Sequence, residues 1–300
     1  MSRLESAPEP IAGGRRIYLK REDLHDLGAF KWRGAMPALE KFRAEGATGV
    51  VTASTGNHGA ATAWAARLLG LEPFVYAPEN ASKTKLDRLR ELGAVVRLIG
   101  SDVDEAKDVA RAYADERGLP LFEDGAEPAQ YDGYTAIGVE LLEQLDEPPA
   151  AVVVPVGNGA LLGGVGRALM TRSPSTLRMG VAVAAAPVMA DSWDAGRPLV
   201  SDRSATIADG LAVRVAIPYA VGVLRTVATY MLSVSEREIA RALAAFADAG
   251  IRVEGAAAAG LAALPQLPDL EGPVVLVVTG RNIDDALLER ARSAPRSFPD

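Results

Sequence analysis

Short apolar runs alternate along the chain with longer segments in which apolar residues recur at helical spacing. Runs of apolar and β-branched residues predict strands, and the spaced patterns between them predict helices. Such alternation is typical of α/β proteins, in which helices cover parallel sheets. In the first half, strands are expected at residues 50–53, 72–77 and 94–99, and helices at 59–70, 82–93 and 102–117.

The second half of the chain continues the same alternation. It contains no internal repeat and no long linker, so the pattern does not mark a domain boundary. Its strands are rich in valine, as buried strands of parallel sheets are. They are expected at residues 151–155, 179–185 and 273–279.

Two helices of the second half have signatures of their own. Ser235 and Glu238 have the spacing of a capping box, in which each side chain binds the backbone amide of the other residue. This predicts a helix over 235–249 that ends before Gly250. The alanine-rich segment 254–265 predicts a short buried helix rather than a disordered tract.

Composition excludes several classes of function. The 300 residues are 49% hydrophobic, which is enough for a large buried core. The formal net charge is −7 and no basic run stands out, so neither nucleic acid nor an anionic membrane is expected as a partner. The chain has no cysteine, and its two histidines, His25 and His58, are too few for a catalytic zinc site. A small molecule is the expected partner.

The sequence shows no targeting or membrane segment. Residues 1–10 are polar and contain prolines, so no signal peptide is expected. The longest apolar stretch, residues 211–234, is interrupted by Arg214, Pro218 and Arg225 and does not predict a membrane span. We therefore expect a soluble, cytoplasmic protein.

Three glycine-containing segments carry the candidate chemistry. The loops TASTGNHGA (52–60) and VPVGNGALLGG (154–164) each follow a strand and open a helix, where free backbone amides attract a carboxylate or phosphate. GAFKWRG (28–34) places Lys31 between two aromatic residues. Each loop alone also fits an ordinary capped turn. A phosphorylated cofactor bound through an imine needs all three parts, and pyridoxal 5'-phosphate meets that description.

Six segments in order resemble the fold-type II pyridoxal-phosphate enzymes. The resemblance extends from about residue 18 to about residue 284 and is greatest to the threonine dehydratase and serine racemase branch, with some threonine synthase-like features. The segments are YLKREDLHDLGAFKWRGA, TASTGNHG, VPVGNGALLGG, TIADGLAV, VEGAAAAGLAAL and VVTGRNID.

The resemblance implies an α/β fold of the tryptophan synthase β type, with two lobes built on parallel sheets. A small lobe that binds the substrate carboxylate, residues 48–134, is inserted into a large cofactor-binding lobe. The large lobe consists of residues 1–47 and 135–300. In this family the cofactor lies in the cleft between the lobes.

The resemblance also implies which residues bind pyridoxal 5'-phosphate. Lys31 forms the Schiff base with the cofactor aldehyde and then removes the substrate α-proton, and Phe30 lies against the pyridine ring. Thr279 lies beside the pyridine nitrogen, where a neutral hydroxyl leaves that nitrogen less protonated than a carboxylate would. The remaining cofactor residues are Asn57 at the phenolic oxygen, Gly157, Asn158, Gly159, Ala160 and Leu161 at the phosphate, and Glu254.

Two of these assignments have an alternative. Glu254 equally fits a carboxylate that stabilises a helix start, and Thr279 fits a threonine that ends a buried strand.

The substrate carboxylate is assigned to Ser54, Thr55, Asn57 and His58. Thr55 is also a candidate catalytic acid or base, because serine racemases have a serine at this position.

The reaction implied is β-elimination from a β-hydroxy-α-amino acid such as threonine or serine, which gives a 2-oxo acid and ammonia. A threonine synthase-like replacement, an amino-acid racemase and a non-catalytic cofactor-binding protein stay open as alternatives. Ala29 stands where relatives have serine, which indicates a departure in substrate or reaction. Ala186 precedes Pro187 where cation-dependent relatives have glutamate, so no divalent metal is expected. We expect a homodimer.

Overall fold

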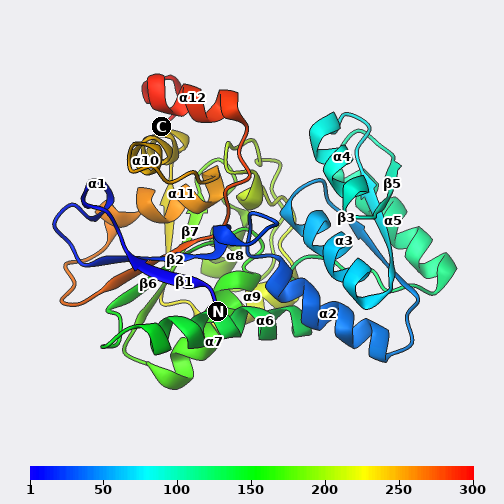
Figure 1. Cartoon of the computed structure of the whole chain (residues 1–300), viewed down its shortest axis with the longest axis horizontal. Coiled ribbons are helices and arrows are strands. Elements are labelled where there is room, and N and C mark those ends of the chain that lie inside the picture. The colour runs from blue at the N-terminus through cyan, green and yellow to red at the C-terminus, as the bar shows by residue number, and fades with distance from the viewer. The chain divides into compact units, whose positions relative to one another are not determined.

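The computed structural model describes residues 1–300, and these form two compact units (Figure 1). The first unit consists of Met1–Phe30 and Tyr134–Asp300, and the second consists of Lys31–Gly133. The second unit therefore begins before residue 48, and includes the helix that follows Lys31. The lobe boundaries at residues 48 and 134 stay a prediction.

The first unit contains a six-stranded sheet in the order β1-β2-β9-β6-β7-β8. All neighbouring strands are parallel except β1 and β2, which pair antiparallel. The predicted parallel sheet is confirmed, whereas this antiparallel edge and β8 were not predicted. The strands are β1 (Arg3–Ser6), β2 (Ile17–Arg21), β6 (Ala151–Pro155), β7 (Leu177–Val183), β8 (Tyr230–Val234) and β9 (Val274–Val278).

Helices cover both faces of this sheet. α11 and α10 lie over one face, and α7 with α9 lies over the other (Figure 1). α6 crosses the boundary between the two compact units at Gly133. The helices are α1 (Glu9–Ala12), α6 (Pro128–Gln144), α7 (Ala160–Arg172), α8 (Val188–Ala195), α9 (Pro218–Val227), α10 (Glu236–Asp248), α11 (Gly255–Ala262) and α12 (Asp285–Ser293).

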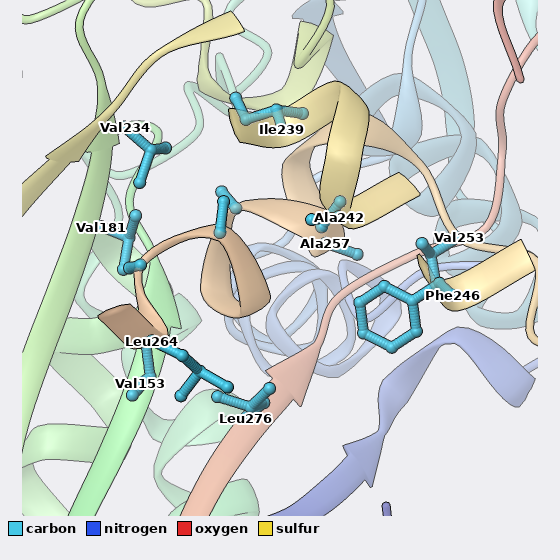
Figure 2. Packing of buried hydrophobic residues seen from close by; sticks show 14 of the residues in the cluster. Val153, Val181, Val234, Ile239, Ala242, Phe246, Val253, Ala257, Leu264 and Leu276 are labelled. Atoms are coloured by element: carbon cyan, nitrogen blue, oxygen red, sulfur yellow. The ribbon is translucent and has the colours of Figure 1, made fainter. Parts of the chain in front are cut away.

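The core of the first unit lies between the sheet and helices α10 and α11. Figure 2 shows Val153, Val181 and Leu276 on three strands, and Phe246 of α10 and Ala257 of α11 in the same buried cluster. The small alanine side chains of α11 are buried, so the predicted alanine-rich buried helix is confirmed. α10 packs closely on α11, and α11 contacts the strands β6, β7 and β9.

The predicted capping box begins α10. The Ser235 hydroxyl accepts from the Glu238 amide at 3.2 Å, and Glu238 Oε2 accepts from the Ser235 amide at 2.7 Å. Two amides that a helix start would leave unpaired are thereby satisfied, which stabilises the helix by about 1 kcal/mol. The structure confirms both this helix and its start.

The second unit contains a parallel three-stranded sheet in the order β3-β4-β5. Alternate side chains of β4 point to opposite faces: Val75 contacts α3 and α4, while Phe74 and Tyr76 contact α5. The predicted elements of this half are confirmed within a few residues. They are β3 (Gly49–Ala53), β4 (Glu72–Ala77), β5 (Val95–Leu98), α3 (Asn57–Leu69), α4 (Lys83–Glu91) and α5 (Val103–Arg117). The helix α2 (Trp32–Ala44) was not predicted. None of the helices in either unit combines the length and apolar character needed to cross a bilayer.

A buried lysine holds the antiparallel edge of the first unit. Lys20 of β2 has no exposed side-chain surface. Its Nζ donates to Glu140 Oε2 at 2.8 Å, to Gln144 Oε1 at 2.9 Å and to the Ser2 carbonyl at 3.0 Å. An unpaired ammonium is strongly unfavourable in such a place, so Lys20 depends on the carboxylate of Glu140.

Replacing Glu140 with glutamine should lower the free energy of unfolding by about 3 kcal/mol, because the Lys20 ammonium then stays buried without an opposite charge. Urea titration followed by circular dichroism measures the change. Glu147→Gln is the matched control, since Glu147 pairs with Arg16 where the side chains are 51% and 57% exposed. Its effect should stay below about 0.5 kcal/mol. Equal effects of the two substitutions would contradict the importance of the buried pair.

Candidate active site

A glycine-rich loop joins β6 to α7 in the first unit. Gly159 is the N-cap of α7, has φ 93°, a conformation that favours glycine, and has no side chain with which to cap the helix. A Cβ atom on Gly159 would lie 2.5 Å from Leu224 Cδ1. Asn158 Oδ1 accepts from the Ala160 amide at 3.1 Å. The loop thus presents backbone amides at a helix N-terminus, which is a favourable environment for an anion such as phosphate.

Residues 207–211, within the TIADGLAV segment, pack closely against the backbone of this loop and of the start of α11. A Cβ atom on Gly157 would collide with the Gly210 carbonyl, and one on Gly255 would collide with the Ile207 carbonyl. The Ile207 amide donates to Glu236 Oε2 at 2.7 Å, which ties the segment to the start of α10. The sequence identified this segment only by resemblance, whereas the structure gives it a positioning role.

Thr279 follows β9 directly and is 3% exposed. Its Oγ1 is buried and has no hydrogen-bond partner within the protein. A buried hydroxyl without a partner is destabilised by about 1 to 3 kcal/mol, so this atom is suited to a polar ligand atom. Since β9 lies beside β6 in a parallel sheet, Thr279 and the glycine loop lie at the same edge of that sheet.

The first residues of the GAFKWRG segment are attached to this sheet edge. The Phe30 amide donates to the Thr279 carbonyl at 3.0 Å, and Ala29 forms a β-bridge with Gly280. The Phe30 ring lies 5.1 Å from the ring of Tyr134. These contacts fix Phe30 beside Thr279, and Lys31 is the next residue of the chain.

Glu254 also lies at this edge, at the N-terminus of α11. Its amide donates to the Gly280 carbonyl at 3.0 Å, and its Oε2 accepts from the Asn282 amide at 3.3 Å. The structure therefore brings Glu254 and Thr279 to the same loop. Its side chain makes no cap hydrogen bond to α11, so both the cofactor role and the helix-start role of Glu254 stay predictions.

In the second unit, Ser54, Thr55 and Asn57 lie where β3 leads into α3. Gly56 is the N-cap of α3 and no side chain caps that helix. The Ser54 hydroxyl accepts from the Gly56 amide at 3.2 Å. The amides at the start of α3 and the hydroxyls beside them form an environment that favours a carboxylate.

His58 points from this loop into the interior of the second unit. Its side chain is buried, its Nε2 lies 3.1 Å from the Phe122 carbonyl, and its ring is 4.6 Å from the Phe122 ring. Burial lowers the pKa of the His58 imidazole, so the ring is neutral at neutral pH. The His58 ring thus contacts Phe122. The contribution of His58 to carboxylate binding would come from its backbone amide.

Lys31 pairs with a carboxylate that the sequence analysis missed. Lys31 Nζ donates to Asp124 Oδ2, and the two side chains are 14% and 22% exposed. Burial alone would raise the pKa of the Asp124 carboxyl, but the nearby positive charge of Lys31 holds it well below its usual range. No local pattern in the sequence pointed to it, because the pairing of Leu121 with Val51 of β3, just before Asp124, appears only in the structure.

The comparisons with known proteins identify the family of the chain. The sequence profile of the family described as "Pyridoxal-phosphate dependent enzyme" matches residues 3–280. The chain belongs to this family. Its members are recognised by a sequence pattern that extends over both compact units, and the mixed α/β fold with mainly parallel sheets is the one that the resemblance implied.

Individual relatives show which members of the family the chain is similar to. An L-threonine ammonia-lyase from Geobacter sulfurreducens is 37% identical over 275 residues, which cover 90% of this chain and 68% of that protein. The processed form of threonine deaminase isoform 2 from Solanum lycopersicum has a TM-score of 0.90 and 30% identity, covering 97% of this chain and 86% of that chain. Maize serine racemase has a TM-score of 0.88 and 27% identity, covering 97% and 91%.

Gly157→Ala should weaken binding of pyridoxal phosphate by at least about tenfold, because the added methyl displaces the loop from the Gly210 carbonyl. Titration of the cofactor-free protein, followed by absorbance, measures the affinity. Gly222→Ala in α9 is the matched control, since its methyl would meet nothing within 4 Å. It should leave the affinity unchanged and stabilise the helix by up to about 1 kcal/mol. Unchanged affinity in Gly157→Ala would show that this loop does not hold the cofactor.

Proposed function

We propose that this pyridoxal-phosphate enzyme is an ammonia-lyase that acts on β-hydroxy-α-amino acids such as threonine or serine and releases a 2-oxo acid and ammonia. The observation that carries the proposal is the buried, unpartnered hydroxyl of Thr279 at the sheet edge that also bears the glycine-rich loop. The similarity to proteins named threonine ammonia-lyase and threonine deaminase supports the choice of substrate.

The residues of the first unit fit the cofactor. The Thr279 hydroxyl would satisfy the pyridine nitrogen, and the amides of residues 157–161 would hold the phosphate. Phe30 would lie against the ring, because its backbone is fixed beside Thr279. Glu254 would approach the same ring from the start of α11, where it is already bound to the loop after Thr279.

The neutral character of Thr279 favours elimination. When bound, pyridoxal phosphate supplies an electron sink that acidifies the α-proton of an amino acid. A hydroxyl does not enforce protonation of the ring nitrogen, as a carboxylate would, so the sink stays moderate. Loss of the β-hydroxyl is then a more favourable way to relieve charge at the α-carbon than transamination.

Lys31 is the proposed catalytic base and the point of covalent attachment. Its Nζ would accept the α-proton after it is displaced by the substrate amine. Asn57, at the first position of α3, would bind the phenolic oxygen of the cofactor. These roles require a primary amine at position 31, and a guanidinium or a neutral side chain could not replace it.

The substrate carboxylate would bind to hydroxyls and amides at the start of α3, in Ser54, Thr55, Asn57 and His58. Binding at this place fixes the α-carbon relative to the base. Thr55 would in addition act as an acid or base if the enzyme racemises its substrate, as in the alternative that the similarity to maize serine racemase supports.

A homodimer is also proposed, and it would show twice the mass of one chain in light scattering.

Lys31→Ala should abolish both an absorbance band near about 410 nm and the release of 2-oxo acid, because the amine that binds the cofactor aldehyde is lost. Lys41→Ala is the matched control: Lys41 lies ten positions further along in α2, where it pairs with Glu127. It should retain both signals. A band that persists in Lys31→Ala would exclude Lys31 as the attachment point.

A panel of amino acids should separate the proposed reaction from its alternatives. Threonine or serine should yield equal amounts of 2-oxo acid and ammonia. Turnover only with phosphorylated or otherwise activated substrates would support a replacement reaction, and inversion without 2-oxo acid would support a racemase. A cofactor band without turnover of any substrate would support a non-catalytic protein. Each of these three results would overturn the proposal.

A further inference from the structure

The carboxylate of Asp124 has no role in the function proposed above, although it contacts the amine on which that function depends. Asp124 Oδ2 accepts from Lys31 Nζ. Asp124 Oδ1 accepts from Gln130 Nε2 at 2.5 Å and lies 3.6 Å from His58 Nδ1. All four residues belong to the second compact unit.

Buried neighbours fix the orientation of this carboxylate. Gln130 has no exposed surface, and its Oε1 accepts from the Gly125 amide at 2.8 Å. The Tyr131 hydroxyl donates to the Gly125 carbonyl at 2.8 Å, so the turn after Asp124 is held at both polar groups. The side-chain amide of Gln130 therefore cannot rotate freely. It binds Oδ1 of Asp124, and Oδ2 is directed to Lys31.

His58 does not supply a positive charge to Asp124. A carbonyl oxygen only accepts, so the nitrogen that bonds the Phe122 carbonyl, Nε2, must carry the ring proton. In the neutral ring Nδ1 then has a lone pair, and its separation of 3.6 Å from Asp124 Oδ1 is too long for a hydrogen bond. The neighbouring carboxylate, Glu123, pairs with Lys107 and Arg111 instead. Lys31 is thus the cation that faces Asp124.

We propose that Asp124 is a positioning residue that holds Lys31 Nζ as an ammonium. The inference rests on the proposed function in one respect: the α-proton passes from the substrate to Nζ, and hydroxide leaves the β-carbon. An ammonium paired with Asp124 keeps this proton, so the proton does not return to the α-carbon before hydroxide has left. Asp124 thereby favours elimination over α-proton exchange.

Uptake of the cofactor by the cofactor-free protein tests the pairing without any substrate. Only a neutral amine attacks the aldehyde, so the rate at which absorbance near about 410 nm rises should increase with pH. Asp124→Asn keeps the size of the side chain but removes the negative charge that accepts from Nζ. The rate profile of Asp124→Asn should therefore lie at lower pH than that of the wild type.

Two further variants make this result specific. Glu123→Gln removes a neighbouring carboxylate that pairs elsewhere, and its rate profile should superimpose on that of the wild type. Asp124→Glu restores the charge and should return the profile toward that of the wild type. Superposition of the Asp124→Asn and wild-type profiles, or an equal shift in Glu123→Gln, would overturn the proposal.

The partition between exchange and elimination tests the consequence for the reaction. With threonine in D₂O, deuterium at the α-carbon of recovered substrate is compared with the 2-oxo acid formed. Asp124→Asn should raise this ratio about tenfold, because the ammonium then lacks the charge-assisted hydrogen bond that holds its proton. An unchanged ratio, with both rates reduced together, would mean that Asp124 is only structural. If the wild type forms no 2-oxo acid, the proposed function fails, and the cofactor-uptake profile still decides the role of Asp124.

Discussion

The close approach of backbone to backbone behind the glycine-rich loop is the constraint on which the candidate site of the first unit depends. Gly157 lies against the Gly210 carbonyl and Gly255 against the Ile207 carbonyl, with no room for a side chain. These contacts place the start of α7 and the start of α11 at the edge where β6 and β9 end. Because the loop is held by peptide groups rather than by flexible side chains, its free amides have fixed directions.

A second constraint is electrostatic and belongs to the other unit. The amine of Lys31 and the carboxylate of Asp124 are both largely removed from water, and each makes the charge of the other tolerable. The neutral ring of His58 and the amide of Gln130 complete this arrangement without adding charge. The same physical rule operates at Lys20 and Glu140 in the first unit, where the pair supports the fold rather than a reaction.

Much of the fold followed from local patterns in the sequence. Apolar runs gave the strands β3, β4, β6 and β9, and the spacing of Ser235 and Glu238 gave the start of α10. The strands β1, β2 and β8 were missed, because β1 is short, β2 ends in Lys20 and Arg21, and β8 lies in an apolar stretch without alternation. The resemblance of six ordered segments gave the family, which the match over residues 3–280 confirms.

The sequence by itself determined the elements, the family and the residues with candidate chemistry, because hydrophobic periodicity, capping and glycine positions act over a few residues. Tertiary structure alone decided that Asp124 meets Lys31, that the hydroxyl of Thr279 is buried without a partner, and that residues 207–211 support the glycine-rich loop. These are contacts between residues far apart in the chain. Their existence depends on how strands are ordered and how closely loops approach, which no local pattern records.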